Sequence, residues 1–253
     1  MSKNKDFIKS HFDKLASSRA SWIKKSKGFY FEDIRAMQEL IPAESKVLEI
    51  GCGNGNLLGS LNPSYGLGID ISPEMIIKAR EKFKNLNFLE ADIENRGSIS
   101  SINEVFDFII LSDTIGYLND IESTLKKLHK LCNADTRIII AYYSPIWEPI
   151  LNIGTWFNLK MPELPKTLLN ESDISSLLGS TGFETVKKQK KIIFPFSFFG
   201  IGRVLNRYIS CLPLFSYLCL RNYVISRSLE SVSSDLPVSA SVIIPCRNEK
   251  GNI

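Results

Sequence analysis

Long apolar stretches are missing from this chain of 253 residues. No run of about 18 uncharged apolar residues occurs, so the sequence predicts no transmembrane helix. Residues 1–6 also lead into no short apolar core of the kind that a secretory signal peptide contains. We therefore expect a cytoplasmic protein.

Residues that bind metals are also scarce. The chain has two histidines, and its cysteines are odd in number and never spaced as C-x-x-C: Cys52, Cys132, Cys211, Cys219 and Cys246. This pattern indicates reduced thiols, and it predicts neither a structural zinc site nor any other metal site. The net charge of +4 is too small to indicate a nucleic-acid partner.

Acidic residues are absent between Glu184 and Glu230, a stretch that contains eight basic residues and many phenylalanines and tyrosines. We consider two interpretations of its central part, residues 195–220. It forms either a buried lid whose basic side chains reach solvent, or an interfacial segment that contacts anionic lipid head groups at the inner face of the membrane.

The most informative motif is the run V-L-E-I-G-C-G-N-G at residues 47–55. Its first half predicts a buried strand, and the alternate glycines predict a tight turn into a helix that begins near Asn56. A turn without Cβ atoms can approach a ligand closely, and the helix N-terminus offers free N–H groups. Because position 56 is Asn, the spacing differs from the G-x-G-x-x-G dinucleotide fingerprint. The motif predicts a site for a nucleotide-like cofactor.

Predicted strands and helices alternate around this motif. They are helices 6–24 and 31–41, strands 46–50 and 66–70, helix 73–84, strands 87–90 and 106–111, helix 121–132, strand 136–143, a loop at 144–149, helix 171–180, and strands 182–193 and 221–228. Such alternation favours an α/β fold with a doubly wound, mostly parallel sheet.

Two carboxylates accompany the glycine motif. Glu49 lies two residues before Gly51, and Asp70 ends the next predicted strand. With these positions, residues 30–190 resemble the class I S-adenosylmethionine (SAM) dependent methyltransferases, whose first motif is E/D-x-G-x-G-x-G. The resemblance implies a Rossmann-like, seven-stranded sheet whose last two strands form an antiparallel edge.

The same resemblance implies a division of the chain and roles for single residues. The expected parts are an N-terminal helical lid (1–45), a SAM-binding domain (46–230) with an insertion at 195–220 between the last two strands, and a C-terminal piece (231–253). The expected SAM contacts are Glu49, Gly51, Cys52, Gly53 and Gly55 at the methionine end, Asp70 at the ribose, Ile71, Asp92 and Ile93 at the adenine, and Ser112 after the fourth strand. Asp113 is expected to line the cleft beside Ser112.

Methyl transfer mainly requires the protein to align the acceptor with the methyl group, because the sulfonium already activates that group. An alcohol acceptor can also require a base. The candidates are Asp113 and His11, which we take as the predicted catalytic residues, and His129 and Glu148; His129 is expected on a solvated helix face. Where nitrogen methyltransferases often carry N/D-P-P-Y/F, this chain reads S-D-T-I at 112–115, which disfavours nucleobase methylation.

The C-terminal piece carries a second resemblance. Residues 240–249, A-S-V-I-I-P-C-R-N-E, follow a short polar linker at 231–235. They resemble the opening strand and loop of GT-A-fold glycosyltransferases related to dolichol-phosphate-sugar synthases, which implies a methyltransferase–glycosyltransferase fusion cut just inside its second domain. An ordinary C-terminal strand is the alternative interpretation.

The leading hypothesis is a SAM-dependent methyltransferase that methylates an oxygen of a glycan or glycolipid acceptor in cell-surface glycan biosynthesis. Two alternatives stay open: methylation of an unrelated small molecule, and a catalytically silent SAM-fold module that anchors or regulates the attached glycosyltransferase. The presence of Glu49, of all three glycines and of Asp70 disfavours the silent module.

Overall fold

The computed structural model describes residues 3–100, 102–195, 206 and 213–230. They form a seven-stranded sheet with the order β3-β2-β1-β4-β5-β7-β6. The strands are β1 (Lys46–Ile50), β2 (Tyr65–Asp70), β3 (Asn87–Glu90), β4 (Phe108–Ser112), β5 (Arg137–Tyr143), β6 (Phe183–Lys191) and β7 (Arg221–Ser228). Strand β7 is antiparallel to β5 and β6, and the other pairs are parallel. The predicted Rossmann-like fold is confirmed.

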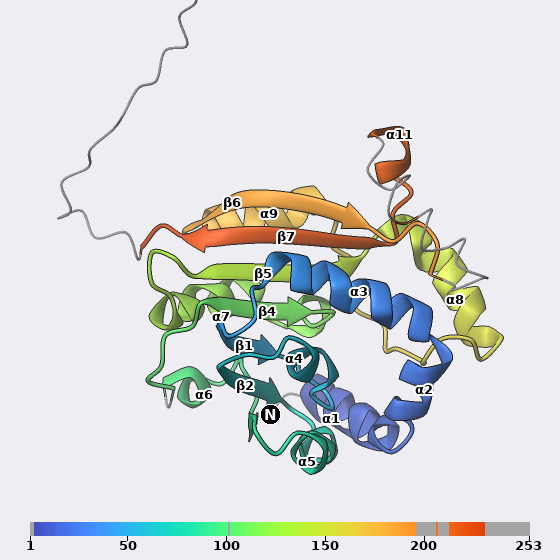
Figure 1. Ribbon diagram of the computed structural model, residues 1–253, viewed down its shortest axis with the longest axis horizontal. Coiled ribbons are helices and arrows are strands. Elements are labelled where there is room, and N and C mark those ends of the chain that lie inside the picture. The colour runs from blue at the N-terminus through green and yellow to red at the C-terminus, as the bar shows by residue number, and fades with distance from the viewer. Residues whose placement is uncertain (1–2, 101, 196–205, 207–212, 231–253) are drawn as a thin grey trace, which may run out of the picture.

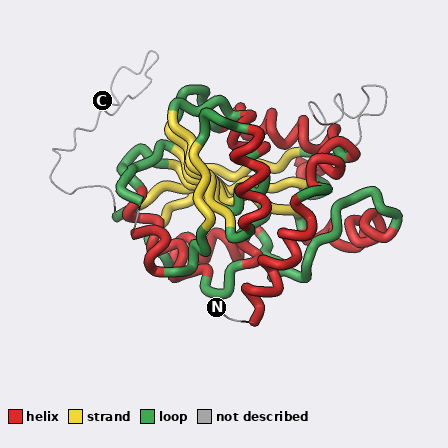
Figure 2. The backbone as a smooth tube through the Cα atoms, turned by 90° about the horizontal axis from the view of Figure 1, so that it is seen from below, coloured by secondary structure: helices red, strands yellow, loops and turns green. Residues whose placement is uncertain are grey.

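Helices cover both faces of this sheet, as Figure 2 shows. The α-helices are α1 (Lys3–Ala16), α2 (Arg19–Lys25), α3 (Lys27–Leu40), α4 (Asn56–Ser60), α5 (Pro73–Lys82), α6 (Arg96–Ser100), α7 (Ile121–Leu128), α8 (Glu148–Trp156), α9 (Glu171–Ser180) and α11 (Pro213–Ser216). Three short 3-10 helices join them: η1 (Ile115–Tyr117), η2 (His129–Leu131) and η3 (Pro145–Trp147).

Successive side chains of each strand point to opposite faces, so one strand contributes to two cores. In β4, Ile109 and Leu111 pack in the cluster that includes α7 and α9. Ile110 between them packs in the cluster that includes α3 and α5. Because both faces are covered, the strand must be apolar at every central position, which explains its continuous Ile/Leu run.

The arrangement of strands also determines where a ligand can bind. The parallel strands end at the right of Figure 1, and α1, α2 and α8 gather at that end. In open α/β sheets, ligands bind beyond the carboxyl ends of the strands. The N-terminal helices therefore lie where a cofactor site is expected.

Two helical predictions differ from the structure. Residues 6–24 form two helices, because α1 ends in a turn in which both the amide and the hydroxyl of Ser18 donate to the carbonyl of Leu15. The expected loop at 144–149 instead leads directly into α8, and Pro149 fits in the first turn of that helix, where an N–H has no intrahelical partner. The charge-poor sequence of α8 gave it no amphipathic signal.

Some predictions fall outside the described residues. Segment 231–253 and most of segment 195–220 are among them, so the glycosyltransferase resemblance and both interpretations of the basic aromatic stretch stay predictions. Among the described residues, no helix has the length and apolarity needed to cross a bilayer.

Candidate active site

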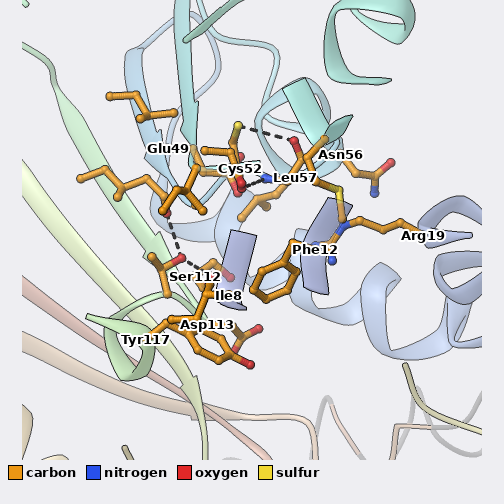
Figure 3. Close-up of a pocket in the computed structure, with 18 of the residues that line it drawn as sticks. Ile8, Phe12, Arg19, Glu49, Cys52, Asn56, Leu57, Ser112, Asp113 and Tyr117 are labelled. Carbon is orange, nitrogen blue, oxygen red and sulfur yellow. Dashed lines mark hydrogen bonds between the residues drawn. The ribbon is translucent and has the colours of Figure 1, made fainter. Parts of the chain in front are cut away.

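A pocket lies at the carboxyl ends of β1, β2 and β4, under the N-terminal helices (Figure 3). Nine of the ten residues predicted to contact SAM line it: Glu49, Gly51, Cys52, Gly53, Asp70, Ile71, Asp92, Ile93 and Ser112. Asp113 also lines it. Gly55 and His11 do not appear among its lining residues.

The glycine turn adopts a backbone that other residues rarely adopt. Gly51, Gly53 and Gly55 have φ values of +74°, +52° and +71°. A Cβ on Gly51 would lie 2.1 Å from Thr114 Oγ1, and one on Gly55 would lie 2.7 Å from the Phe88 ring. Gly51 therefore allows β1 and β4 to end close together, whereas Gly55 serves packing rather than the pocket.

Glu49 is buried at the end of β1, where its Oε2 accepts a hydrogen bond from the amide of Leu58 at 3.0 Å. Burial raises the pKa of this carboxyl from its ordinary value near 4.5 to about 8, and the Leu58 amide and Arg19 oppose the rise only in part. Glu49 is therefore mostly protonated at neutral pH until a positive charge enters the pocket.

Asp70 joins the first two loops of the site. Its Oδ2 accepts from the amide of Gly53 at 2.7 Å, and its Oδ1 accepts from the amide of Ser72 at 2.9 Å. Burial raises the pKa of Asp70, and these two amides oppose the rise. Each carboxylate oxygen has a second lone pair, so both can accept a further hydrogen bond from a ligand hydroxyl.

The first helix is attached to the end of β3. Lys5 of α1 is buried, and its Nζ lies 3.3 Å from Asp92 Oδ1 and also contacts Glu94. Lys9, one turn later, pairs with Glu90 at 2.9 Å. These ion pairs hold α1 over the part of the pocket formed by Asp92 and Ile93.

Arg19, at the start of α2, is a pocket residue that the sequence did not indicate. Its side chain extends from the N-terminal helices to the neighbourhood of Phe12 and Asn56 (Figure 3). Its Nε is buried without a hydrogen-bond partner among the described residues, and its Nη1 contacts only Met161 Sδ, at 3.8 Å. A Cβ on Gly53 would lie 3.0 Å from this Nε. The guanidinium thus faces the turn with an unused donor.

A second arginine, Arg221 at the start of β7, is completely buried behind the pocket. Its Nε donates to Asp33 Oδ1 of α3 at 3.0 Å, its Nη2 to Ser112 Oγ at 2.7 Å, and its Nη1 to Asp113. Burial lowers the pKa of Arg221, but the carboxylates of Asp113 and Asp33 outweigh it and hold the pKa above its ordinary value. The pairing also holds Asp113 at a φ of +56°.

The end of the pocket near Asp113 is aromatic. It is lined by Phe12, Phe29, Tyr30, Tyr117 and Tyr143. Burial raises the pKa of the Tyr30 and Tyr143 phenols, so both stay protonated. Neither hydroxyl makes a hydrogen bond to another described residue, which leaves two donors for a ligand.

Glu163 completes this end of the pocket from the loop after α8. Its carboxylate lies between the Nζ atoms of Lys160 and Lys166, at 2.5 and 2.7 Å. Burial raises the pKa of Glu163, but the two lysines outweigh it and hold the pKa below its ordinary value. The three side chains form an ionic cluster at the wall.

Comparison with known proteins identifies the family and the fold. A family model described as a methyltransferase domain matches residues 41–192. This chain belongs to that methyltransferase family. Solved structures agree on the fold: a possible histamine N-methyltransferase of Thermotoga maritima has a TM-score of 0.64 at 18% identity, over 88% of this chain and 99% of that chain. Magnesium protoporphyrin IX methyltransferase of Synechocystis, with bound S-adenosylhomocysteine, has a TM-score of 0.60 at 16% identity, over 89% and 100%.

The curated relatives are matched over a smaller share of this chain than the solved structures. A malonyl-[acyl-carrier protein] O-methyltransferase of Paenibacillus sp. is 24% identical over 161 residues, which are 58% of this chain and 58% of the relative. One of Bacillus anthracis is 26% identical over 68% of this chain and 64% of the relative. The first four curated relatives are matched over 58, 18, 47 and 42% of their lengths, so the chain spans about half of them or less. The chain contains a SAM-dependent methyltransferase domain.

Neither histidine of the methyltransferase lines the pocket. His11 Nε2 lies 3.3 Å from the carbonyl oxygen of Pro162, so this ring contacts the loop after α8 rather than the pocket. The expectation of a solvated His129 was wrong: its ring stacks on Phe183 at 4.0 Å and lies within hydrogen-bond distance of Ser228 Oγ and the Thr181 carbonyl. Its neighbours come from β6 and β7, which local sequence does not reveal.

Replacement of the buried Arg221 tests how much its ion pairs contribute to the free energy of unfolding. Arg221→Met leaves the buried Asp33 carboxylate without its cationic partner, with the Tyr223 hydroxyl still donating to it at 2.6 Å. We expect a loss of about 3–5 kcal/mol in the free energy of unfolding, measured by urea denaturation. Arg227→Met, on the same strand but in a half-exposed pair with Glu184, is the matched control and should lose less than about 1 kcal/mol. Equal losses would contradict the assignment.

Proposed function

We propose that this methyltransferase transfers the methyl group of SAM to an oxygen of a hydroxylated acceptor, a glycan or glycolipid. The proposal rests on one observation: the two halves of a single pocket are lined by different kinds of chemical group. Glycine backbone, carboxylates and an unpaired guanidinium line one half, and aromatic rings with free hydroxyls line the other. The first half suits an amino-acid nucleoside, and the second suits a hydroxylated ring.

Several features support a fit between the first half and SAM. In our proposal Arg19 holds the methionine carboxylate, since its buried Nε lacks a partner and faces Gly53. Glu49 faces the positive methionine end, and Asp70 accepts the ribose hydroxyls. Ile71, Ile93 and Asp92 surround the adenine. When bound, SAM supplies an activated methyl group, so the protein has only to hold the acceptor oxygen in line.

The second half supports an oxygen acceptor. One oxygen of Asp113 is held by Arg221, and its other oxygen makes no hydrogen bond to a described residue, so it can accept the proton of an acceptor hydroxyl. The acceptor oxygen then forms its bond to the methyl carbon as the carbon–sulfur bond breaks, and S-adenosylhomocysteine leaves. Methylation of oxygen is also supported by the names of the malonyl-[acyl-carrier protein] O-methyltransferases.

A labelling experiment tests this function. With methyl-labelled SAM, we expect the chain to label sugar hydroxyls of glycans or glycolipids and Asp113→Asn to reduce the rate at least about tenfold. A malonyl thioester serves as the competing acceptor. Label on the thioester alone would refute the acceptor class, and label on neither, with SAM bound, would refute the proposed reaction with these acceptors.

Arg19→Met tests the proposed carboxylate contact. Because a charge-assisted hydrogen bond is lost, we expect SAM to bind about ten- to a hundredfold more weakly in calorimetric titration. Arg35→Met is the matched control, since Arg35 lies on α3 and pairs with Glu32 and Glu39 outside the pocket. An unchanged affinity in Arg19→Met would remove this residue from the site.

The raised pKa of Glu49 predicts a proton linkage. Its pKa is about 8 without ligand, and the positive charges of SAM favour the ionised carboxylate, so binding below pH 8 should release a proton and affinity should fall as the pH falls. Titrations at pH 7 in phosphate and in Tris should therefore give different apparent enthalpies. The difference should vanish in Glu49→Gln; equal enthalpies for the wild type would contradict the linkage.

A further inference from the structure

The outer side of η3 and α8 carries a row of exposed apolar side chains, with the exposed Glu148 at its start. Its exposed side chains recur at helical spacing and are Ile146, Ile150, Ile153, Trp156 and Phe157, with Trp156 81% exposed. No charged residue occurs from Pro149 to Leu159. The opposite side of the helix is already used, because Leu151 packs against Phe29, Ile192 and Leu220. A contiguous exposed row of this kind is typical of an interaction surface, unlike scattered single residues.

The row continues onto α11. Trp147 Nε1 donates to the carbonyl of Leu218 at 2.9 Å, which holds η3, just before α8, against the segment that follows α11. Phe215, Tyr217 and Leu218 are exposed there as well. The apolar surface thus combines segments far apart in sequence, at the right end of the molecule in Figure 1.

Three lysines flank the other end of this surface. Lys24, Lys25 and Lys27 are exposed, and none makes an ion pair with another described residue. Lys25 Nζ donates to the carbonyl of Asn158 at 3.2 Å, and Ser26 Oγ to that of Leu159 at 3.4 Å. The contacts place the lysines beside the last residues of the apolar row. Between Asp13 and Glu32 the chain has five basic residues and no acidic one.

We infer that this face, the apolar row of α8 and α11 with Lys24, Lys25 and Lys27, docks onto an anionic lipid bilayer. Aromatic and aliphatic side chains enter the head-group region, and the unpaired lysines contact the anionic head groups. A second copy of the chain is disfavoured as occupant, because it would bring the same three lysines to the interface. The inference assigns membrane contact to α8, to the three lysines and, within segment 195–220, to its described residues Phe215, Tyr217 and Leu218.

Docking would also bring the pocket close to an amphiphilic acceptor in the bilayer. This part of the inference rests on the proposed function. The loop after α8 runs from the exposed Phe157 and Leu159 to Met161 and Glu163, which line the pocket. Leu159 is therefore only four positions before Glu163, which lies at the acceptor end of the site. An amphiphilic acceptor can reach Asp113 while its lipid part stays in the bilayer.

Vesicle co-sedimentation of the full chain tests the inference. We expect binding to phosphatidylcholine vesicles that contain phosphatidylglycerol, weak binding to phosphatidylcholine alone, and loss of binding in high salt. The double variant Ile150→Ser/Trp156→Ser and the double variant Lys24→Glu/Lys25→Glu should each bind at least about tenfold more weakly. Val186→Ser on β6 and Lys84→Glu after α5 are exposed controls and should bind as the wild type does.

Three outcomes would overturn the inference. They are no binding to anionic vesicles, full binding by the Ile150→Ser/Trp156→Ser variant, and self-association in analytical ultracentrifugation that this variant abolishes, which would make the face a self-interface. Circular dichroism and urea denaturation of each variant check that it folds. Failure of the wild type to bind SAM would refute the proposed function while leaving the vesicle result intact, so the two failures are distinguishable.

Discussion

The buried guanidinium of Arg221 is the constraint on which the architecture of the site depends. A charge that is fully removed from water must find partners, and its partners come from α3 and from the end of β4. They meet only if β7 lies antiparallel beside β5 in its observed register. The same network holds Asp113 in its left-handed conformation, so the sheet edge, the third helix and the acceptor end of the pocket form together.

Fold and site differ in how far they can be predicted. Strand β1 begins and ends where the apolar pattern predicts, because burial on both faces leaves a continuous signal. The Arg221 network and the stacking of His129 on Phe183 depend on strand pairing between distant segments, and no local pattern carries that information. Helix α8 was missed for a related reason: its exposed face is apolar, so it lacks the polar side by which a surface helix is recognised.

Within the site, the residues found from sequence are those of one continuous turn and of neighbouring strand ends. Glu49, Gly53 and Asp70 lie together because parallel strands end at one edge, which topology guarantees. Arg19 and Tyr30 come instead from helices that precede the sheet, and a helical pattern does not say which polar residue faces inward. For the same reason the sequence did not reveal the position of His11, which lies on the expected helix but contacts the loop after α8.

These N-terminal helices connect the cofactor to the surface. Arg19 carries an unused buried donor, which is unfavourable until a ligand supplies an acceptor. Lys5 attaches α1 to Asp92, and Lys25 attaches α2 to the loop after α8. A ligand that pairs with Arg19 therefore stabilises the position of α1 and α2 over the pocket and, through Lys25, the loop that carries Met161 and Glu163. In the proposed SAM complex, binding at the glycine turn would thus be linked to the order of the acceptor end, because the same two helices contact both.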